Sequence, residues 1–179
     1  MHSASTALTF VLSLATPIAA QTIPYYHMWA GTTGVPHVSQ CNFTDLQLQL
    51  LSTGESPQYL DKIGSTFSNG TYSNTNFTTD ITFTVQPAGW STGWHENPKV
   101  QFIVPLSGSW TIHMTDGSMA TMGPGEVALG EDQFATAISS GEYAGAIGHN
   151  ATNVGDEAVN LMIVQTDWIP KVGEPCWLE

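Results

Sequence analysis

The chain has 179 residues, with 15 acidic side chains against three lysines and no arginine, and a formal net charge of −12. A nucleic-acid surface needs clustered cations, so this composition excludes a nucleic-acid partner. It also argues against phosphorylated ligands, which bidentate arginines usually hold. The chain has six tryptophans, and only 10% of its residues are charged, which fits a β-rich protein with an aromatic-lined pocket.

The first twenty residues have the pattern of a secretory signal peptide. Their apolar stretch, from residue 7 to residue 14, is too short to span a bilayer, and two small residues offer a cleavage site before Gln21. We therefore expect a protein of the secretory pathway, extracellular or vesicular, with no membrane anchor. Sequons for N-glycosylation agree with this route. They begin at Asn42, Asn69, Asn76 and Asn150.

Two cysteines remain after the signal segment, Cys41 and Cys176. In an oxidising compartment a pair of cysteines favours a disulfide, and the alternative is two buried free thiols. The predicted bridge ties the N-terminal part of the domain to its C-terminal tail.

Strand signals follow in chain order. Residues 21–40 contain several glycines and prolines and predict an irregular arm, 45–51 has weak helix or strand character, and 65–79 predicts a loop or hairpin. Beyond residue 80, apolar runs and alternating patterns predict short strands that argue for a closed or sandwich-like all-β architecture. These strands are predicted at 81–85, 100–106, 109–114, 126–129 and 159–165, with a hairpin turn at Asp116-Gly117.

We divide the chain accordingly into four parts. Residues 1–20 form the signal peptide, 21–79 an N-terminal arm with outer strands, 80–170 a β-barrel and 171–179 a C-terminal tail. The sequence has no internal repeat, so we expect one barrel.

Polar residues frame the strand predicted at 100–106. His95 comes just before this strand and is followed by Asn97 and Gln101, and the segment runs from Gly93 to Gly108. A second pattern begins at Pro124-Gly125, continues through Glu131-Asp132 and closes at Gly148-His149, where we expect His149 to end a later strand.

These two patterns resemble the paired motifs of the cupin family, and most of all those of small single-domain cupins of the secreted, fungal type. His95 stands at the first histidine of the usual motif, Asn97 at the second, Gln101 at the glutamate, and His149 at the histidine of the second motif. The resemblance covers about residues 80–166. It implies an all-β fold, a single-domain jelly-roll barrel, in which His95, Gln101 and His149 face one cavity.

The metal motif is degenerate. The usual cupin site has three histidines and a carboxylate, whereas Asn97 and Gln101 are neutral amides, so a divalent metal held by His95, Gln101 and His149 would be bound weakly. The metal-free reading makes His95 and His149 a general acid and base and lets Gln101 hold a substrate oxygen. No other cofactor is expected.

Further residues are candidates for substrate binding. Lys99 could hold an anion, the Glu131–Asp132 pair could orient a histidine, and His27 could reach the mouth if the arm folds over it. The segment between Asp132 and His149 predicts either a mobile lid or an extra hairpin. The remaining candidates are His113, Phe134 and Tyr143.

The sequence therefore predicts a secreted cupin enzyme acting on a small, largely apolar organic substrate by acid/base chemistry, such as cyclisation, dehydration, isomerisation or decarboxylation. Such proteins resemble tailoring proteins of secondary metabolism. The alternatives are a metal-dependent cupin oxygenase and a non-catalytic small-molecule-binding or stereocontrol protein. A homodimer, as in many cupins, is the other partner that the resemblance implies.

Overall fold

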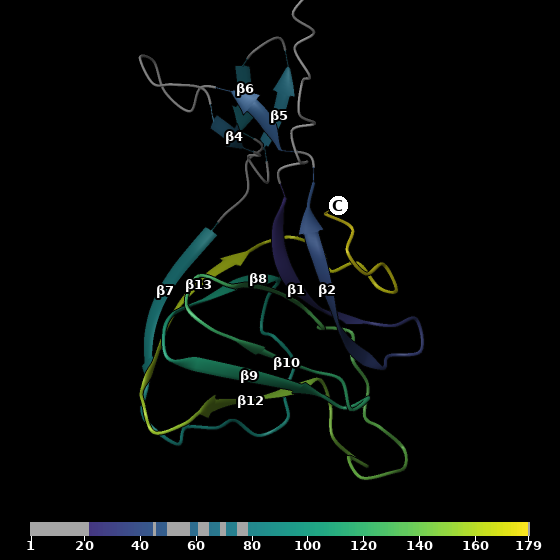
Figure 1. The fold of residues 1–179 in the computed structure, drawn as a ribbon. Coiled ribbons are helices and arrows are strands. Elements are labelled where there is room, and N and C mark those ends of the chain that lie inside the picture. Colours follow the sequence, from purple (N-terminus) through teal and green to yellow (C-terminus); the bar gives the residue numbers. More distant parts are fainter. Residues whose placement is uncertain are drawn as a thin grey trace, which may run out of the picture.

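The computed structural model describes residues 22–44, 46–49, 58–60, 65–68, 71–74 and 79–178, and every regular element in these ranges is a β-strand (Figure 1). The strands are β1 (Ile23–Ala30), β2 (Pro36–Phe43), β3 (Gln47–Gln49), β4 (Gln58–Leu60), β5 (Ser65–Ser68), β6 (Thr71–Asn74), β7 (Thr79–Gln86), β8 (Gln101–Ser107), β9 (Ser109–Met114), β10 (Met119–Met122), β11 (Val127–Glu131), β12 (His149–Val154) and β13 (Val159–Thr166).

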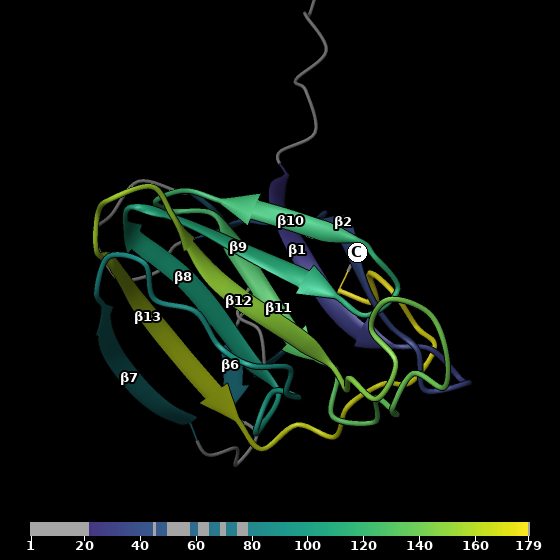
Figure 2. The ribbon, with the colours of Figure 1, turned by 90° about the horizontal axis from the view of Figure 1, so that it is seen from below.

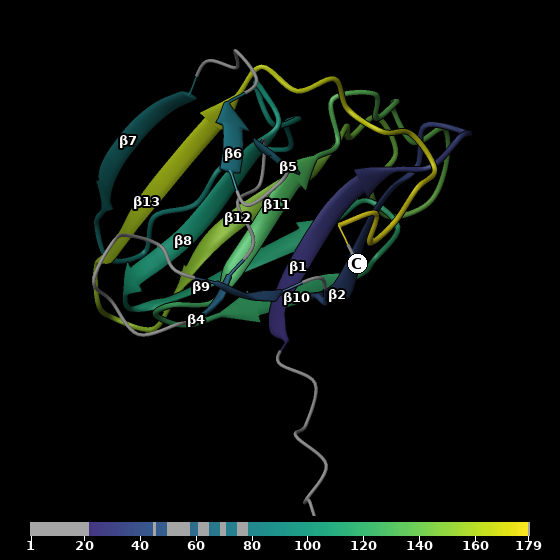
Figure 3. The same cartoon turned by 90° about the horizontal axis from the view of Figure 1, so that it is seen from above.

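Two sheets form the walls of the barrel. The larger has the order β2-β1-β11-β8-β13-β7, and the smaller has the order β10-β9-β12. Figures 2 and 3 view the molecule from opposite sides and show the smaller sheet laid across the larger one. This is the predicted all-β architecture, a barrel of jelly-roll type. Two short hairpins, β3–β4 and β5–β6, pair separately.

The core lies between the two sheets because each strand turns alternate side chains inward. Met28 from the large sheet and Ile112, Met114 and Met122 from the small sheet are completely buried there. A second cluster, around Tyr25, lies beneath the C-terminal tail. The tail therefore covers part of the large sheet and is packed as a component of the domain.

The N-terminal segment is not the irregular arm that its glycines and prolines predict. It forms β1 and β2, and β1 pairs in parallel with β11 from Tyr25 opposite Val127 to Trp29 opposite Glu131. The breakers lie at the strand starts or in the turn: Pro24 is the second residue of β1, Pro36 is the first of β2, and Gly34, with φ of 82°, belongs to the turn between the two strands. The expectation of an arm over 21–40 is therefore wrong.

The predicted Cys41–Cys176 disulfide is confirmed. It joins β2 to the C-terminal tail across 135 residues, with the two Cα atoms 5.2 Å apart. A cross-link that closes so long a loop stabilises a fold by about 3–5 kcal/mol in the chain-entropy account.

Most predicted strands beyond residue 80 agree with β7, β8, β9, β11 and β13, whereas β10 and β12 were not predicted. His149 begins β12 and does not end a strand. The segment between Asp132 and His149 contains turns but no strand, so it is not an extra hairpin of strands. A hairpin does occupy part of 65–79, as β5 and β6.

Several expectations are not tested by these strands. The signal segment 1–20 and the sequons at Asn69 and Asn76 lie outside the described residues, whereas Asn42 and Asn150 are half-buried on β2 and β12. Within the described ranges, no helix is long and apolar enough to cross a membrane.

Candidate functional site

A cavity of about 350 Å³ opens between the two sheets of the barrel. Strands β7, β8, β9, β12 and β13 and the segment before β8 supply its walls, which carry no Lys, Arg, Asp or Glu side chain. Its only titratable groups are therefore two imidazoles. The lining residues are Thr82, Thr84, Gln86, Trp90, Thr92, His95, Asn97, Gln101, Ile103, Trp110, His149, Ala151, Leu161 and Ile163.

His95 and His149 come together through a local backbone bridge. The amide of His95 donates to the carbonyl of His149 at 2.9 Å, the reverse bond is 2.8 Å, and the ring centroids are 4.5 Å apart. Gly148 permits this approach because its φ is 73° and a Cβ there would collide with the His95 carbonyl. The Gly-His sequence of the second motif thus serves the contact between the two histidines.

Asp132 is the centre of a buried polar network behind this histidine pair. Its Oδ2 accepts from His149 Nδ1 at 2.7 Å, and its Oδ1 accepts from both the backbone N and the Nδ2 of Asn97, at 2.9 and 2.6 Å. Burial by itself raises the pKa of the Asp132 carboxyl. The hydrogen bond and charge of His149, together with the Asn97 donors, outweigh burial and hold that pKa below its ordinary value. Asp132 is therefore an ionised carboxylate.

A chain of amides extends from this carboxylate through the segment before β8 to β8 and β13. Gln101 Nε2 donates to Asn97 Oδ1 at 2.7 Å, and Gln165 Nε2 donates to Gln101 Oε1 at 2.9 Å. The ionised carboxylate can only accept, so every amide in the chain must point its donor toward Asp132. Gly130 makes room for the Asn97 side chain, since a Cβ at position 130 would lie 2.6 Å from it.

The same contacts fix the tautomers of the two histidines. His149 must carry its proton on Nδ1 to donate to Asp132, and His95 must do so to donate to the carbonyl of Gly93 at 3.0 Å. In the neutral rings Nε2 then holds the lone pair, and neither Nε2 has a protein partner among the described residues. Two basic nitrogens are thus left at the cavity.

One more acid lies close to the network. Burial, and after it the charge of Asp132, raise the pKa of the Glu96 carboxyl above its ordinary value. Glu96 is half-buried and does not line the cavity.

The donor set does not fit the metal centre that the cupin resemblance implies. Asn97 and Gln101 stand at two of the ligand positions, yet the oxygen of each already accepts from a neighbouring amide. Two imidazole nitrogens are left, and no group of three or more His, Cys, Asp or Glu side chains suited to a metal occurs in the described part of the chain. Carboxylate charge and ligand number, which set affinity, are both lacking.

Glu131 and His27 face away from the cavity, although Glu131 adjoins Asp132. His27 Nε2 donates to Glu131 Oε2 at 2.8 Å, and both side chains are completely buried. The carboxylate also accepts from the Lys171 backbone and the Trp177 indole, and His27 Nδ1 accepts from the Cys176 backbone. Successive residues along the chain here point to opposite faces, which is how Glu131 faces away from the cavity. The bonds of the His27–Glu131 pair instead anchor the C-terminal tail. Neither His27 nor Glu131, both predicted as substrate-binding residues, lines the cavity.

The other candidates are also placed outside the cavity. Lys99 pairs with Asp80 at 3.0 Å and, with Phe134, lines a separate pocket of about 270 Å³. His113 alternates with the buried Ile112 and Met114 on β9, so it lies on the outer face.

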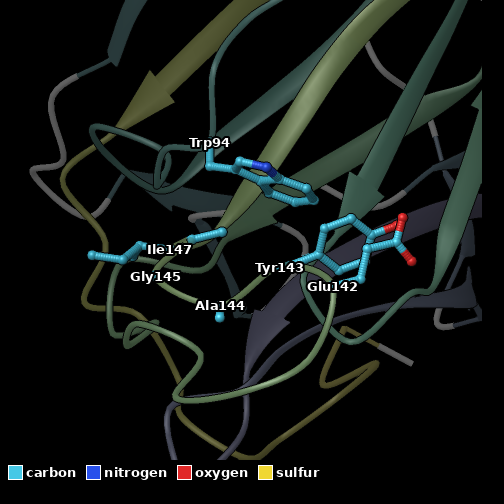
Figure 4. Close-up of a pocket in the computed structure, with 7 residues that line it drawn as sticks. Trp94, Glu142, Tyr143, Ala144, Gly145 and Ile147 are labelled. Atoms are coloured by element: carbon cyan, nitrogen blue, oxygen red, sulfur yellow. The ribbon is translucent and has the colours of Figure 1, made fainter.

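Tyr143 belongs to a third pocket, of about 420 Å³, that flanks the histidine bridge. Figure 4 shows Trp94 beside Tyr143, with Ile147 across from them, and the two ring centroids are 4.9 Å apart. Trp94 immediately precedes His95, and Ile147 lies two residues before His149. The segment between Asp132 and His149 therefore borders the site without entering the cavity that the two histidines line.

No protein-family model and no curated protein sequence matches the chain. Among solved structures it is similar to the protein YhaK from Escherichia coli, with 18% identity, 56% of this chain and 40% of that chain covered, and a TM-score of 0.41. It is also similar to the capsular polysaccharide assembling protein CapF from Staphylococcus aureus, with 17% identity, 63% and 30% covered, and a TM-score of 0.31. The chain spans less than half the length of either protein. Neither likeness carries an argument about function.

Proposed function

We propose that this chain is a cupin enzyme of the secretory pathway that acts on a small, largely apolar molecule by proton transfer, without requiring a bound metal. The observation that carries the proposal is His149 on the wall of an uncharged cavity, held from behind by the Asp132 carboxylate. A carboxylate that holds Nδ1–H of a histidine orients its Nε2 as a general base and stabilises the imidazolium that forms.

The reaction begins when His149 Nε2 removes a proton from a carbon or hydroxyl of the substrate. The electron pair left behind can expel a β-hydroxyl, which takes a proton from the imidazolium form of His95 and departs as water. In an isomerisation the proton is instead returned to another atom. His95 is exposed at the mouth, so it regains its proton from solvent. His149 then releases the proton that it removed, which returns both rings to their starting state.

Gln101 has a narrower role in this proposal than the sequence suggests. Both ends of its amide are engaged, and only the second N–H of Nε2 remains to steady negative charge on a substrate oxygen. Its main contribution is to hold Asn97, which in turn holds Asp132. Gln101 is therefore a positioning residue for the base.

The metal-dependent oxygenase remains the alternative enzyme, and the engaged amides of Asn97 and Gln101 count against it. Exhaustive chelation separates the two. The acid/base reading predicts unchanged turnover, whereas loss with chelator and recovery with iron, manganese, copper or zinc would establish the oxygenase or a Lewis-acid reaction.

A non-catalytic binding or stereocontrol protein is the alternative from another class, and the apolar walls of the cavity favour it equally. The two readings differ at His149. A binder needs only the shape of this ring, whereas a base needs its lone pair.

A direct test uses the β-hydroxy ketone formed from acetone and benzaldehyde, whose dehydration to a conjugated enone is followed by ultraviolet absorbance. We expect wild-type protein to accelerate dehydration and His149→Asn to lower the rate by about 100- to 10,000-fold. His113→Asn, a histidine on the outer face, is the matched control and should retain the wild-type rate. Equal rates for wild type and His149→Asn would contradict the proposal.

A further inference from the structure

The far end of the cavity holds two polar groups that the protein leaves without partners. The indole Nε1 of Trp110 and the side-chain oxygen Oε1 of Gln86 are both buried and have no hydrogen-bond partner among the described residues. The two residues are only 3% and 6% exposed, and both line the cavity. A buried donor or acceptor without a partner costs about 1–3 kcal/mol, so the fold by itself does not account for either group.

These two groups belong to one region of the wall. Trp110 lies opposite Asn153 in the pairing of β9 with β12, and Asn153 Nδ2 donates to the backbone carbonyl of Gln86 at 3.1 Å. Trp110 and Gln86 are therefore both neighbours of Asn153. A donor and an acceptor on the wall of one cavity are the complement of a hydroxyl group, whose oxygen accepts one hydrogen bond and donates another.

The distance from the base follows from the strand that connects the two ends. His149 is the first residue of β12 and Asn153 the fifth, so they are four positions apart along the strand. At about 3.3 Å of rise per residue, the region around Trp110 lies roughly 13 Å from the histidine pair. The wall between them is uncharged and includes the apolar Ala151, Leu161 and Ile163 beside three threonines.

We propose that Trp110 and Gln86 form a subsite that reads a hydroxyl at the end of the substrate remote from the reacting carbon. Trp110 donates to the hydroxyl oxygen, and Gln86 accepts its proton. The substrate class is then an elongated, uncharged molecule with an apolar, ring-bearing body and one terminal hydroxyl. That the bound molecule is a substrate rests on the function proposed above. The preference for a hydroxyl-bearing ligand rests on the cavity alone.

The size of the cavity suits such a molecule. A dry cavity of about 150 Å³ is enough to take up benzene, so about 350 Å³ accommodates a bicyclic aromatic. No charged side chain lines the cavity, so an ionised group on the body of the ligand would be buried without a counterion.

The test compares two probes of nearly equal shape, β-naphthol and β-methylnaphthalene, by ligand-observed NMR titration of the whole chain. A purely apolar cavity binds the methyl compound more tightly, because it has the larger hydrophobic transfer free energy. The proposed subsite reverses that order. We expect wild-type protein to bind β-naphthol about tenfold or more tightly than β-methylnaphthalene, as one or two net hydrogen bonds allow.

Two variants assign the preference to its residues. Trp110→Phe removes the donor, Gln86→Met removes the acceptor at similar length, and each should reduce the preference about fivefold or more. Because Trp110 is part of the core, thermal unfolding checks the fold of the first variant, and Gln86→Met tests the proposal independently. Trp29→Phe is the control, since the indole of Trp29 donates to Ser39 outside the cavity.

The outcomes are distinguishable from those of the acid/base proposal because turnover is not measured. Equal binding of the probes, a preference for the methyl compound, binding of neither, or a hydroxyl preference that survives both variants would each overturn the subsite. A hydroxyl preference abolished by either variant supports it, even if no reaction at His149 is ever found.

Discussion

Replacing Asp132 by Asn tests the network behind the base most sharply, because the change preserves shape and removes charge. The carboxylate accepts three hydrogen bonds, from His149 Nδ1 and from two donors of Asn97. An Asn side chain keeps one oxygen for Asn97 but turns an NH₂ group toward His149. The imidazole must then accept at Nδ1 and move its proton to Nε2, so the lone pair no longer faces the cavity.

The loss of stability can be sized from these contacts. Hydrogen bonds to charged groups contribute about 1.5–3 kcal/mol, so we expect Asp132→Asn to lower the free energy of unfolding by about 2–3 kcal/mol. For a domain of this size that corresponds to a fall in Tm of about 4–12 °C. Differential scanning calorimetry measures this shift. Asp116→Asn is a matched control, because Asp116 also pairs with a histidine, His37, at a partly exposed site.

The pH dependence of the free energy of unfolding tests the same Asp132→Asn change independently. The pKa of Asp132 is lower in the folded protein than in the unfolded chain, so its stabilising contribution is present above about pH 4 and is lost as the pH falls through the folded-state value. The raised pKa of Glu96 acts in the opposite direction, with stability lost as pH rises through the carboxyl range. Subtracting the free energy of unfolding of Asp132→Asn from that of the wild type at each pH isolates most of the Asp132 contribution. An Asp132→Asn protein with the wild-type Tm and the wild-type acid profile would refute the reasoning.

Two further predictions concern the frame of the site. Gly130→Ala places a Cβ 2.6 Å from the Asn97 side chain, so we expect the free energy of unfolding, measured by chemical denaturation, to fall by about 1–3 kcal/mol. The control is Gly123→Ala, whose nearest neighbour is 3.8 Å away and which should change stability by less than about 1 kcal/mol. Equal effects of the two changes would contradict the close approach. Replacing Cys41 and Cys176 together by Ala should lower the free energy of unfolding by about 3–5 kcal/mol, and a variant as stable as wild type would show that the tail holds without its cross-link.

The sequence was sufficient for the strand that carries Gln101 and for the cavity that the two histidines share, but not for β12, which His149 begins. Alternation and turn residues identified β8 and β9, and the spacing of His95, Gln101 and His149 placed them on one wall. The disulfide followed from the count of cysteines in an oxidising compartment. These features depend on local patterns or on a two-membered set, which a sequence records directly.

The features that sequence reasoning missed depend on contacts between distant segments. β1 lies in the large sheet because it pairs with β11, about a hundred residues further along the chain, and no local pattern reveals that partner. The contact between Gln165 and Gln101 follows from the register of β8 against β13. The alternation of β9 indicates that Trp110 points inward, but only the packed structure reveals that its indole nitrogen has no partner.

The neighbouring acids Glu131 and Asp132 illustrate the same limit. Treated as a pair, they predict one function, yet Glu131 is the last residue of β11 and Asp132 directly follows it, and successive side chains there point to opposite sides. Asp132 holds His149, and Glu131 holds the C-terminal tail. Strand alternation alone separates the two, but it does not say which of them faces the cavity.

The central claim is that Asp132 holds His149 with its proton on Nδ1 and its lone pair at the cavity. Proton–nitrogen correlation NMR of the histidine rings, recorded at about pH 8 where neutral imidazole tautomers can be assigned, tests this without any substrate. We expect His149 to be the Nδ1–H tautomer in wild-type protein and the Nε2–H tautomer in Asp132→Asn. An Nε2–H tautomer at His149 in the wild type would contradict it, because the nitrogen facing the cavity would then be unable to accept a proton.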